Sequence, residues 1–322
     1  MKAMVLAAGL GTRLRPLTDA RPKALVEIAG RTLLEITLSR LRTFGVTEVI
    51  VNVHHFADQV IDYLKSHKNF GMRIEVSREE VLLDTGGGLK KAAWFFLEDA
   101  AHRDSHRGDS AQLDEPFILH NVDVISTIDF ARMLQFHAEN HALATLAVQS
   151  RQTSRPLLFD DNLQLCGRRI DNQDILISSP NHTAIPPATL SGSEARNLSA
   201  FPSRDERTAS KRAETTNNCH SERSEESAFS SDSPLAPRLP RAKSRGHSPL
   251  PLAFSGIHII SPRLLPMLTE EGVFSIIPSY LRLSSQGEKI LAFRTDQYYW
   301  RDLGRPADLA QAALDLQQNT LP

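Results

Sequence analysis

The residues whose types and spacing most clearly suggest chemistry lie near the N-terminus. The chain reads Leu6-Ala7-Ala8-Gly9-Leu10-Gly11-Thr12-Arg13, and Pro22-Lys23 follows downstream. Glycines at 9 and 11 allow the backbone to approach a ligand closely, so main-chain N–H groups and a threonine hydroxyl can donate to phosphate oxygens. Arginine offers a planar fork for phosphate, and lysine a point charge. The segment predicts a phosphate-binding loop that uses Ala8, Gly9, Gly11, Thr12, Arg13 and Lys23.

Two other kinds of phosphate loop do not fit this segment. A Walker loop requires Gly-Lys-Ser/Thr after four spacer residues, which is absent, and the dinucleotide fingerprint requires a third glycine where this chain has Leu14. The second mismatch argues against a nicotinamide-dependent dehydrogenase. A tight turn with surface cations is the structural alternative, but Gly-x-Gly-Thr-Arg-Leu with a downstream Pro-Lys pair is far more specific than a bare Gly-x-Gly.

Further motifs are spread along the chain. Leu83-Asp84-Thr85-Gly86-Gly87-Gly88 is glycine-rich, the apolar run Phe117–Asn121 leads into Val122-Asp123, and Trp300-Arg301-Asp302-Leu303-Gly304 precedes the last expected helix. A carboxylate after a strand lies at the sheet edge where α/β folds bind ligands. Each motif also has a structural reading, because glycine runs open helices and aspartates cap them. Arg151 and Arg155 could hold a phosphate group or lie in a solvated turn.

The elements that must position these residues alternate along the first part of the chain. Expected strands are Ala3–Ala8, Glu48–Val53, Arg73–Ser77, Phe117–Asn121 and Leu143–Gln149, and expected helices are Thr32–Phe44, Asp58–His67, Leu89–Glu98 and Asp129–Asn140. Order resumes with strands Phe254–Ile260 and Lys289–Arg294 and helices Pro262–Leu268, Ile277–Ser285 and Pro306–Gln317. This rhythm predicts an α/β fold whose central sheet is mostly parallel and covered by helices on both faces.

Between these two parts the composition changes. Residues 171–252 are rich in Ser, Pro, Asn, Arg and Glu and have no sustained apolar period. Such a segment cannot bury enough surface to offset its chain entropy. We expect a single domain formed by residues 1–170 and 253–318, and a disordered low-complexity insertion between them.

The bulk properties exclude several classes of protein. A net charge of -1 gives no indication of binding to nucleic acid or to an anionic membrane. No apolar run approaches the roughly 20 residues that span a bilayer. Two cysteines, Cys166 and Cys219, are too few for a disulfide framework. We therefore expect a cytoplasmic protein, and composition does not indicate its oligomeric state.

Taken together, these motifs resemble the sugar-1-phosphate nucleotidyltransferases, over about residues 1–170 and 253–318. The resemblance is greatest to a short bacterial branch that includes N-acetylmuramate 1-phosphate uridylyltransferases and mannose-1-phosphate guanylyltransferase-like proteins. It implies a Rossmann-like, three-layer fold, in which Arg13 neutralises the triphosphate and Lys23 contacts the α-phosphate. Thr85, Gly86 and Gly87 would recognise the nucleobase.

The same resemblance implies a metal site and a sugar site. Asp123 and Asp302 would hold Mg²⁺, although the family usually has glycine where this chain has Val122. Arg151 or Arg155 would bind the sugar phosphate, and Ser255 and Gly256 would lie near the hexose. The implied reaction is transfer of a nucleotidyl group from an NTP, with UTP the first expectation, to a sugar 1-phosphate. The alternatives are a GTP-using guanylyltransferase and a non-catalytic protein that binds nucleotide sugars.

Overall fold

The apolar run near the N-terminus forms β1 (Lys2–Leu6), an interior strand of the sheet. The computed structural model describes residues 1–102, 115–177 and 248–317. Within them β1 pairs in parallel with β4 (Glu48–Val53) and β6 (Phe117–Asn121), and β4 pairs in parallel with β5 (Arg73–Arg78). Parallel strands bring their carboxyl ends to one edge, so the residues that follow β1, β4 and β6 lie near one another.

The second half of the sheet is mixed. Strand β12 (Leu250–Ile260) runs antiparallel to β6, β8 (Ala144–Gln149) and β9 (Leu157–Phe159), while β13 (Ile290–Arg294) is parallel to β8. The main path of the sheet is β11-β10-β9-β12-β6-β1-β4-β5, with β10 at Leu165–Ile170 and β11 at Gln173–Leu176. Two small sheets pair β2 (Glu27–Ile28) with β3 (Arg31–Thr32), and β7 (Val124–Ser126) with β14 (Trp300–Asp302).

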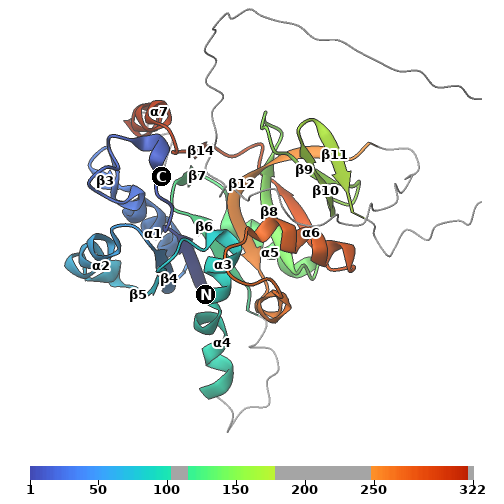
Figure 1. Cartoon of the computed structure of the whole chain (residues 1–322), viewed down its shortest axis with the longest axis horizontal. Helices are drawn as coiled ribbons and strands as arrows, with labels where there is room; N and C mark the ends of the chain where they lie inside the picture. The colour runs from blue at the N-terminus through green and yellow to red at the C-terminus, as the bar shows by residue number, and fades with distance from the viewer. Residues whose placement is uncertain (103–114, 178–247, 318–322) are drawn as a thin grey trace, which may run out of the picture. The chain divides into compact units, whose positions relative to one another are not determined.

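Helices cover both faces of the sheet (Figure 1). They are α1 (Leu33–Thr43), α2 (Ala57–Ser66), α3 (Asp84–Lys91), α4 (Ala93–His102), α5 (Phe130–Glu139), α6 (Ile276–Ser285) and α7 (Pro306–Gln317). Short 3-10 helices occupy Thr12–Leu14, Lys23–Leu25, Lys68–Gly71 and Pro262–Met267. The expected α/β fold is confirmed.

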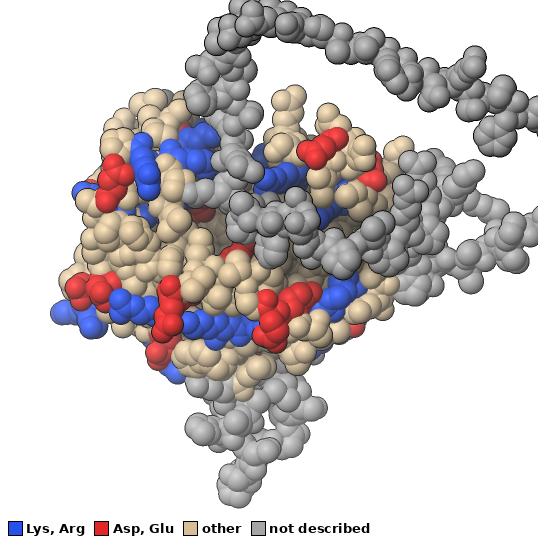
Figure 2. Space-filling model, in the orientation of Figure 1, with Lys and Arg blue, Asp and Glu red and all other residues tan. Residues whose placement is uncertain are grey.

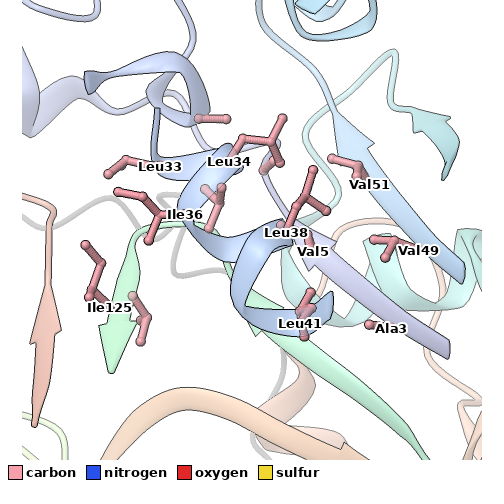
Figure 3. Close-up of a cluster of buried hydrophobic side chains, with 14 of the residues drawn as sticks. Ala3, Val5, Leu33, Leu34, Ile36, Leu38, Leu41, Val49, Val51 and Ile125 are labelled. Carbon is pink, nitrogen blue, oxygen red and sulfur yellow. The ribbon is translucent and has the colours of Figure 1, made fainter. Parts of the chain in front are cut away.

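Alternation along β1 explains why there are two cores. Ala3 and Val5 point to one side and pack with α1, whereas Met4 points to the other side and packs with Leu89 of α3 and Tyr280 of α6. Figure 3 shows the first core, in which leucines of α1 lie over β1 and β4. A strand with both faces buried reads as a continuous apolar run, as this one does.

Helix α1 begins and ends where the sequence indicates. The Thr32 side chain accepts a hydrogen bond from the Glu35 N–H at 3.0 Å, and Gly45 adopts a φ of 77° just beyond the helix. A capping residue three positions before a glutamate and a glycine stop are the local signals for these boundaries.

Both limits of the low-complexity segment differ from the expected ones. The low-complexity segment was expected over residues 171–252, but β11 lies at Gln173–Leu176 and β12 already begins at Leu250. Cross-strand pairing gives both short stretches a place in the sheet that their composition does not indicate. The rest of the expected insertion, residues 178–247, lies outside the described residues.

The surface carries both signs of charge. Figure 2 shows basic and acidic side chains interspersed on the face in view, in keeping with the near-zero net charge. No helix among the described ranges is long and apolar enough to cross a bilayer.

Candidate active site

The predicted phosphate loop leaves β1 and turns at Gly11. Gly11 has a φ of 66°, and a Cβ there would lie 3.0 Å from both the Lys23 Cβ and the Thr18 Cγ2. The Thr18 hydroxyl donates to the Gly11 carbonyl at 2.8 Å, and the next residues form the short helix Thr12–Leu14, whose Leu14 is buried. Both the backbone conformation and the lack of space therefore require glycine here.

Lys23 and Asp123 form an ion pair at the carboxyl edge of the sheet. The Lys23 ammonium donates to Asp123 Oδ2, and the side chains are only 12% and 16% exposed. Burial alone would raise the pKa of Asp123, but the charge and hydrogen bond of Lys23 outweigh it and hold the pKa below its usual value. The two residues are distant in sequence, and the structure brings them together as one charged group.

Asp302 lies beside this pair. It ends β14, where it is paired with Val124 of β7, and Leu303 N–H donates to the Asp123 carbonyl at 2.8 Å. Burial and the nearby Asp123 carboxylate raise the pKa of Asp302. Two neighbouring carboxylates, one of which raises the pKa of the other, are a donor set suited to a hard divalent cation.

Val122 does not crowd the site. Its side chain is 3% exposed and belongs to the core beneath the sheet edge, and its carbonyl accepts a hydrogen bond from the Thr37 hydroxyl of α1 at 3.3 Å. The valine side chain therefore fills the core at this position.

A cavity of about 500 Å³ opens beside Asp302. Its lining includes Arg13, Arg151, Trp300, Asp302 and Arg305. A Cβ on Gly304 would lie 2.6 Å from a guanidinium nitrogen of Arg13, so the glycine of the Asp-Leu-Gly motif leaves room for this cation. The cavity is polar and carries more arginines than aspartates, which suits a ligand bearing phosphate groups.

Arg151 lines the same cavity and is held in place by two contacts. Its guanidinium lies 3.9 Å from the centroid of the Trp300 ring and donates to the Phe254 carbonyl at 2.6 Å. The Trp300 indole N–H donates to the Ser255 carbonyl at 2.7 Å. This stack joins β14 to β12. Arg155, by contrast, is exposed and does not line the cavity.

Ser255 and Gly256 lie where β12 changes register against β8. Gly256 has a φ of 73°, and a Cβ there would lie 2.9 Å from the Val124 Cγ2. Ser255 is fully buried, and its hydroxyl has no hydrogen-bond partner among the described residues. A bulge of this kind redirects side chains beside functional sites. The predicted contacts of both residues with a hexose remain predictions.

The triple glycine lies inside a helix. The expected helix began at Leu89, but α3 begins at Asp84 and includes Gly86, Gly87 and Gly88. The difference has a packing reason, because Cβ atoms on these glycines would lie 2.4 Å from the Phe274 ring, 2.5 Å from the Gly272 carbonyl and 2.8 Å from a Glu79 oxygen. The glycines let α3 approach its neighbours closely, and base recognition by this segment remains a prediction.

A buried polar bridge links the two glycine-rich segments. Asn52 Oδ1 accepts from the Ala7 N–H at 2.7 Å, Asn52 Nδ2 donates to Glu79 at 2.8 Å, and the second Glu79 oxygen accepts from the Leu83 N–H at 2.9 Å. Asn52 and Glu79 are 3% and 2% exposed. The sequence motifs do not include Asn52 or Glu79. An asparagine within the apolar strand Glu48–Val53 was the signal that could have found them.

The sheet, the loop after β1 and the two aspartates define an α/β protein whose candidate ligand site lies at the carboxyl edge of the parallel strands. Residues 2–159 match the sequence profile of the family described as nucleotidyl transferase. The chain therefore contains a nucleotidyl transferase domain.

Curated relatives share this domain. N-acetylmuramate alpha-1-phosphate uridylyltransferase of Caulobacter vibrioides is 55% identical over 93 residues, covering 28% of this chain and 38% of the relative. UTP–glucose-1-phosphate uridylyltransferase of Synechocystis is 31% identical, covering 47% and 37%. A probable mannose-1-phosphate guanylyltransferase of Oryza sativa is 36% identical, covering 46% and 38%. The matches span less than two-fifths of each relative's length.

Solved structures share the fold. HddC of Yersinia pseudotuberculosis, complexed with GMP-PN, superimposes with a TM-score of 0.58 at 17% identity, covering 98% of this chain and 99% of that one. UDP-glucose pyrophosphorylase complexed with UDP-glucose gives 0.58 at 13% identity, covering 99% and 98%. At these identities the similarity concerns the fold alone.

Proposed function

We propose that this protein transfers a nucleotidyl group from a nucleoside triphosphate to a sugar 1-phosphate and releases pyrophosphate. The observation that carries the proposal is the group formed by Lys23, Asp123 and Asp302, which borders the arginine-lined cavity. The relatives' names support the same class of reaction, with uridylyl and guanylyl transfer both represented.

In the proposed reaction, a phosphate oxygen of the sugar 1-phosphate forms a bond to the α-phosphorus of the triphosphate. The bond between the α-phosphorus and the bridging oxygen breaks, and its electrons leave with pyrophosphate. The attacking oxygen is already anionic, so no general base is needed. Catalysis then consists of positioning the two phosphates and neutralising their charge.

Each residue has a separate task in this scheme. Arg13 binds the triphosphate. Lys23 leaves its ion pair with Asp123 and contacts the α-phosphate instead. Arg151, fixed over Trp300, binds the phosphate of the sugar. Asp123 and Asp302 are the residues that would hold Mg²⁺, which supplies charge neutralisation on the triphosphate when bound. The two carboxylates fit that ion, because Mg²⁺ takes few protein ligands and completes its shell with phosphate oxygens and water.

The test is a pyrophosphate-release assay with Mg²⁺, four NTPs and a panel of sugar 1-phosphates. We expect turnover with UTP, with GTP as the alternative. Lys23→Ala and Asp123→Ala should each lower turnover about a hundredfold, the effect of losing one charge contact to the transition state. Lys65→Ala changes an exposed lysine of α2 and should have no effect.

Two results would contradict the proposal. Wild-type turnover in Lys23→Ala or Asp123→Ala would show that these residues have no role in catalysis. If thermal-shift measurements show NTP binding but no sugar phosphate yields pyrophosphate, the protein is a non-catalytic nucleotide binder.

A further inference from the structure

Two buried polar side chains lie between the loop after β1 and the start of α3. Asn52 is the next-to-last residue of β4, and Glu79 directly follows β5. Asparagine and glutamate are usually found at protein surfaces. Their burial is unfavourable unless they are hydrogen-bonded, so the partners of this pair decide what it holds together.

Asn52 extends the contact between β1 and β4 past the end of their backbone pairing. Leu6, the last residue of β1, is paired with Asn52. The Asn52 side chain then accepts from the N–H of Ala7, the first residue after the strand, at 2.7 Å. A side chain of β4 therefore fixes the point at which the phosphate loop leaves the sheet.

Glu79 connects Asn52 to the entry of α3. One Glu79 oxygen accepts from Asn52 Nδ2 at 2.8 Å, and the other accepts at 2.9 Å from the N–H of Leu83, the residue before the helix. The Glu79 N–H donates to the Val53 carbonyl at 2.8 Å, which ties this residue to β4. Three hydrogen bonds, from Ala7 through Asn52 and Glu79 to Leu83, therefore form one connection, the Asn52–Glu79 bridge.

The third glycine of α3 makes room for this bridge. A Cβ on Gly88 would lie 2.8 Å from Glu79 Oε1 and 2.9 Å from Asn52 Nδ2, closer than such atoms come in folded proteins. The backbone of α3 therefore packs directly on the two side chains, and they set its distance from β4.

We propose that the Asn52–Glu79 bridge sets the distance between the loop that binds the triphosphate and the segment that binds the base. Asn52 and Glu79 are then positioning residues for the NTP. This inference rests on the proposed function, because it takes the loop after β1 and the start of α3 as two halves of one NTP site. A ligand that binds two subsites at once gains affinity only when their separation matches it.

The test exchanges the two kinds of side chain. Asn52→Asp places a carboxylate against that of Glu79, and Glu79→Gln places a second amide where only acceptors fit. In the double variant Asn52→Asp/Glu79→Gln, the new carboxylate can accept from the Ala7 N–H and from the new amide. The carbonyl oxygen of that amide can accept from the Leu83 N–H, so all three hydrogen bonds return with almost unchanged volume.

Titration calorimetry with Mg²⁺ compares UTP with inorganic tripolyphosphate, and GTP is measured in parallel. Each single variant should bind UTP about tenfold more weakly, the effect of losing one hydrogen bond to a charged group. Tripolyphosphate contacts the phosphate loop alone, so its affinity should stay within about twofold of the wild type. The double variant should recover UTP binding to within about twofold, because the two residues act as a coupled pair.

Thr145→Val is the matched control for loss of a buried hydrogen bond. The Thr145 hydroxyl is fully buried and hydrogen-bonded to the His137 ring at 2.9 Å, and Thr145 belongs to neither segment of the NTP site. This variant should lower Tm and leave the affinities for UTP and tripolyphosphate unchanged. In steady-state kinetics the single bridge variants should raise the KM for UTP about tenfold and keep kcat within about twofold, the pattern of lost binding without lost chemistry.

Three results would overturn the proposal. Wild-type affinity for UTP in both single variants would show that the bridge has no part in NTP binding. Equal losses for UTP and tripolyphosphate would show that the bridge shapes the phosphate loop alone. A double variant as weak as the single variants would show that the two side chains do not act as a pair. These binding constants decide the inference even if no sugar phosphate is turned over, whereas absent turnover contradicts only the proposed reaction.

Discussion

Replacing Lys23 by methionine removes the charge of the buried pair and keeps most of its volume. The Asp123 carboxylate then loses its hydrogen-bonded partner in a place where it is 16% exposed. Breaking a buried ion pair from one side costs about 3 kcal/mol at the lower end of the observed range. For a folded part of this size, that corresponds to a fall in Tm of roughly 6–12 °C.

The cost should depend on pH in a defined direction. In the wild type the pKa of Asp123 is depressed, so its contribution to stability is present above the pKa of an unfolded aspartate and is lost as pH falls through the folded pKa. In Lys23→Met the unpaired carboxyl protonates more readily. The difference in Tm between variant and wild type should therefore be large at pH 8 and shrink toward pH 4.

The assay is a thermal melt of four proteins: wild type, Lys23→Met, Asp123→Asn and the double variant. If the two side chains stabilise the fold as a pair, the double variant loses less stability than the sum of the single variants. Pyrophosphate release should fall about a hundredfold in each single variant. Additive losses in Tm, or a Tm difference that does not change with pH, would refute the reasoning.

Five further variants test other parts of the protein. Burial and Asp123 raise the pKa of Asp302, so the contribution of this carboxyl to stability is present only at low pH and is lost as pH rises through the folded pKa. Asp302→Asn should therefore raise Tm at pH 8 while abolishing turnover. A lower Tm at pH 8 would contradict this. Gly86→Ala places a Cβ against a packed ring and should cost about 1–3 kcal/mol in a urea melt. A Cβ added at Gly9 would have no atom within 4 Å, so Gly9→Ala should melt as the wild type does. Equal midpoints for Gly86→Ala and Gly9→Ala would show that α3 can move. In steady-state kinetics, Arg151→Gln should raise the KM for the sugar 1-phosphate about tenfold, whereas Arg155→Gln should stay within about twofold, and the opposite order would exchange their roles.

Features set by neighbours in sequence could be predicted. The limits of α1 follow from Thr32, Glu35 and Gly45, and the turn after β1 follows from Gly11. A cap, a glycine stop and a left-handed turn each depend on a few adjacent residues. The strand rhythm of the first part of the chain was predictable for the same reason, because a buried parallel strand is a continuous apolar run.

Features set by distant contacts could not be predicted. The stacking of Arg151 on Trp300 and the bridge between Asn52 and Glu79 join residues far apart in the chain. Whether Arg151 or Arg155 lies at the site could not be decided from sequence, since only the folded sheet shows which of them lines the cavity. Strand β11 was missed because its four residues are all exposed and gain their structure from pairing with β10.

The ends of the long segment between β11 and β12 lie in one row across the sheet. Leu176 is opposite Gly167, Gly167 is opposite Leu158, and Leu158 is opposite Pro251. Three inter-strand steps of about 4.8 Å separate the ends by roughly 14 Å, a gap that about five extended residues cross. Strand pairing thus fixes the distance between the two ends of this segment, and the distance does not depend on the segment itself. A short glycine-serine linker could replace the whole segment between Leu176 and Leu250, which makes this position suitable for inserting a foreign domain.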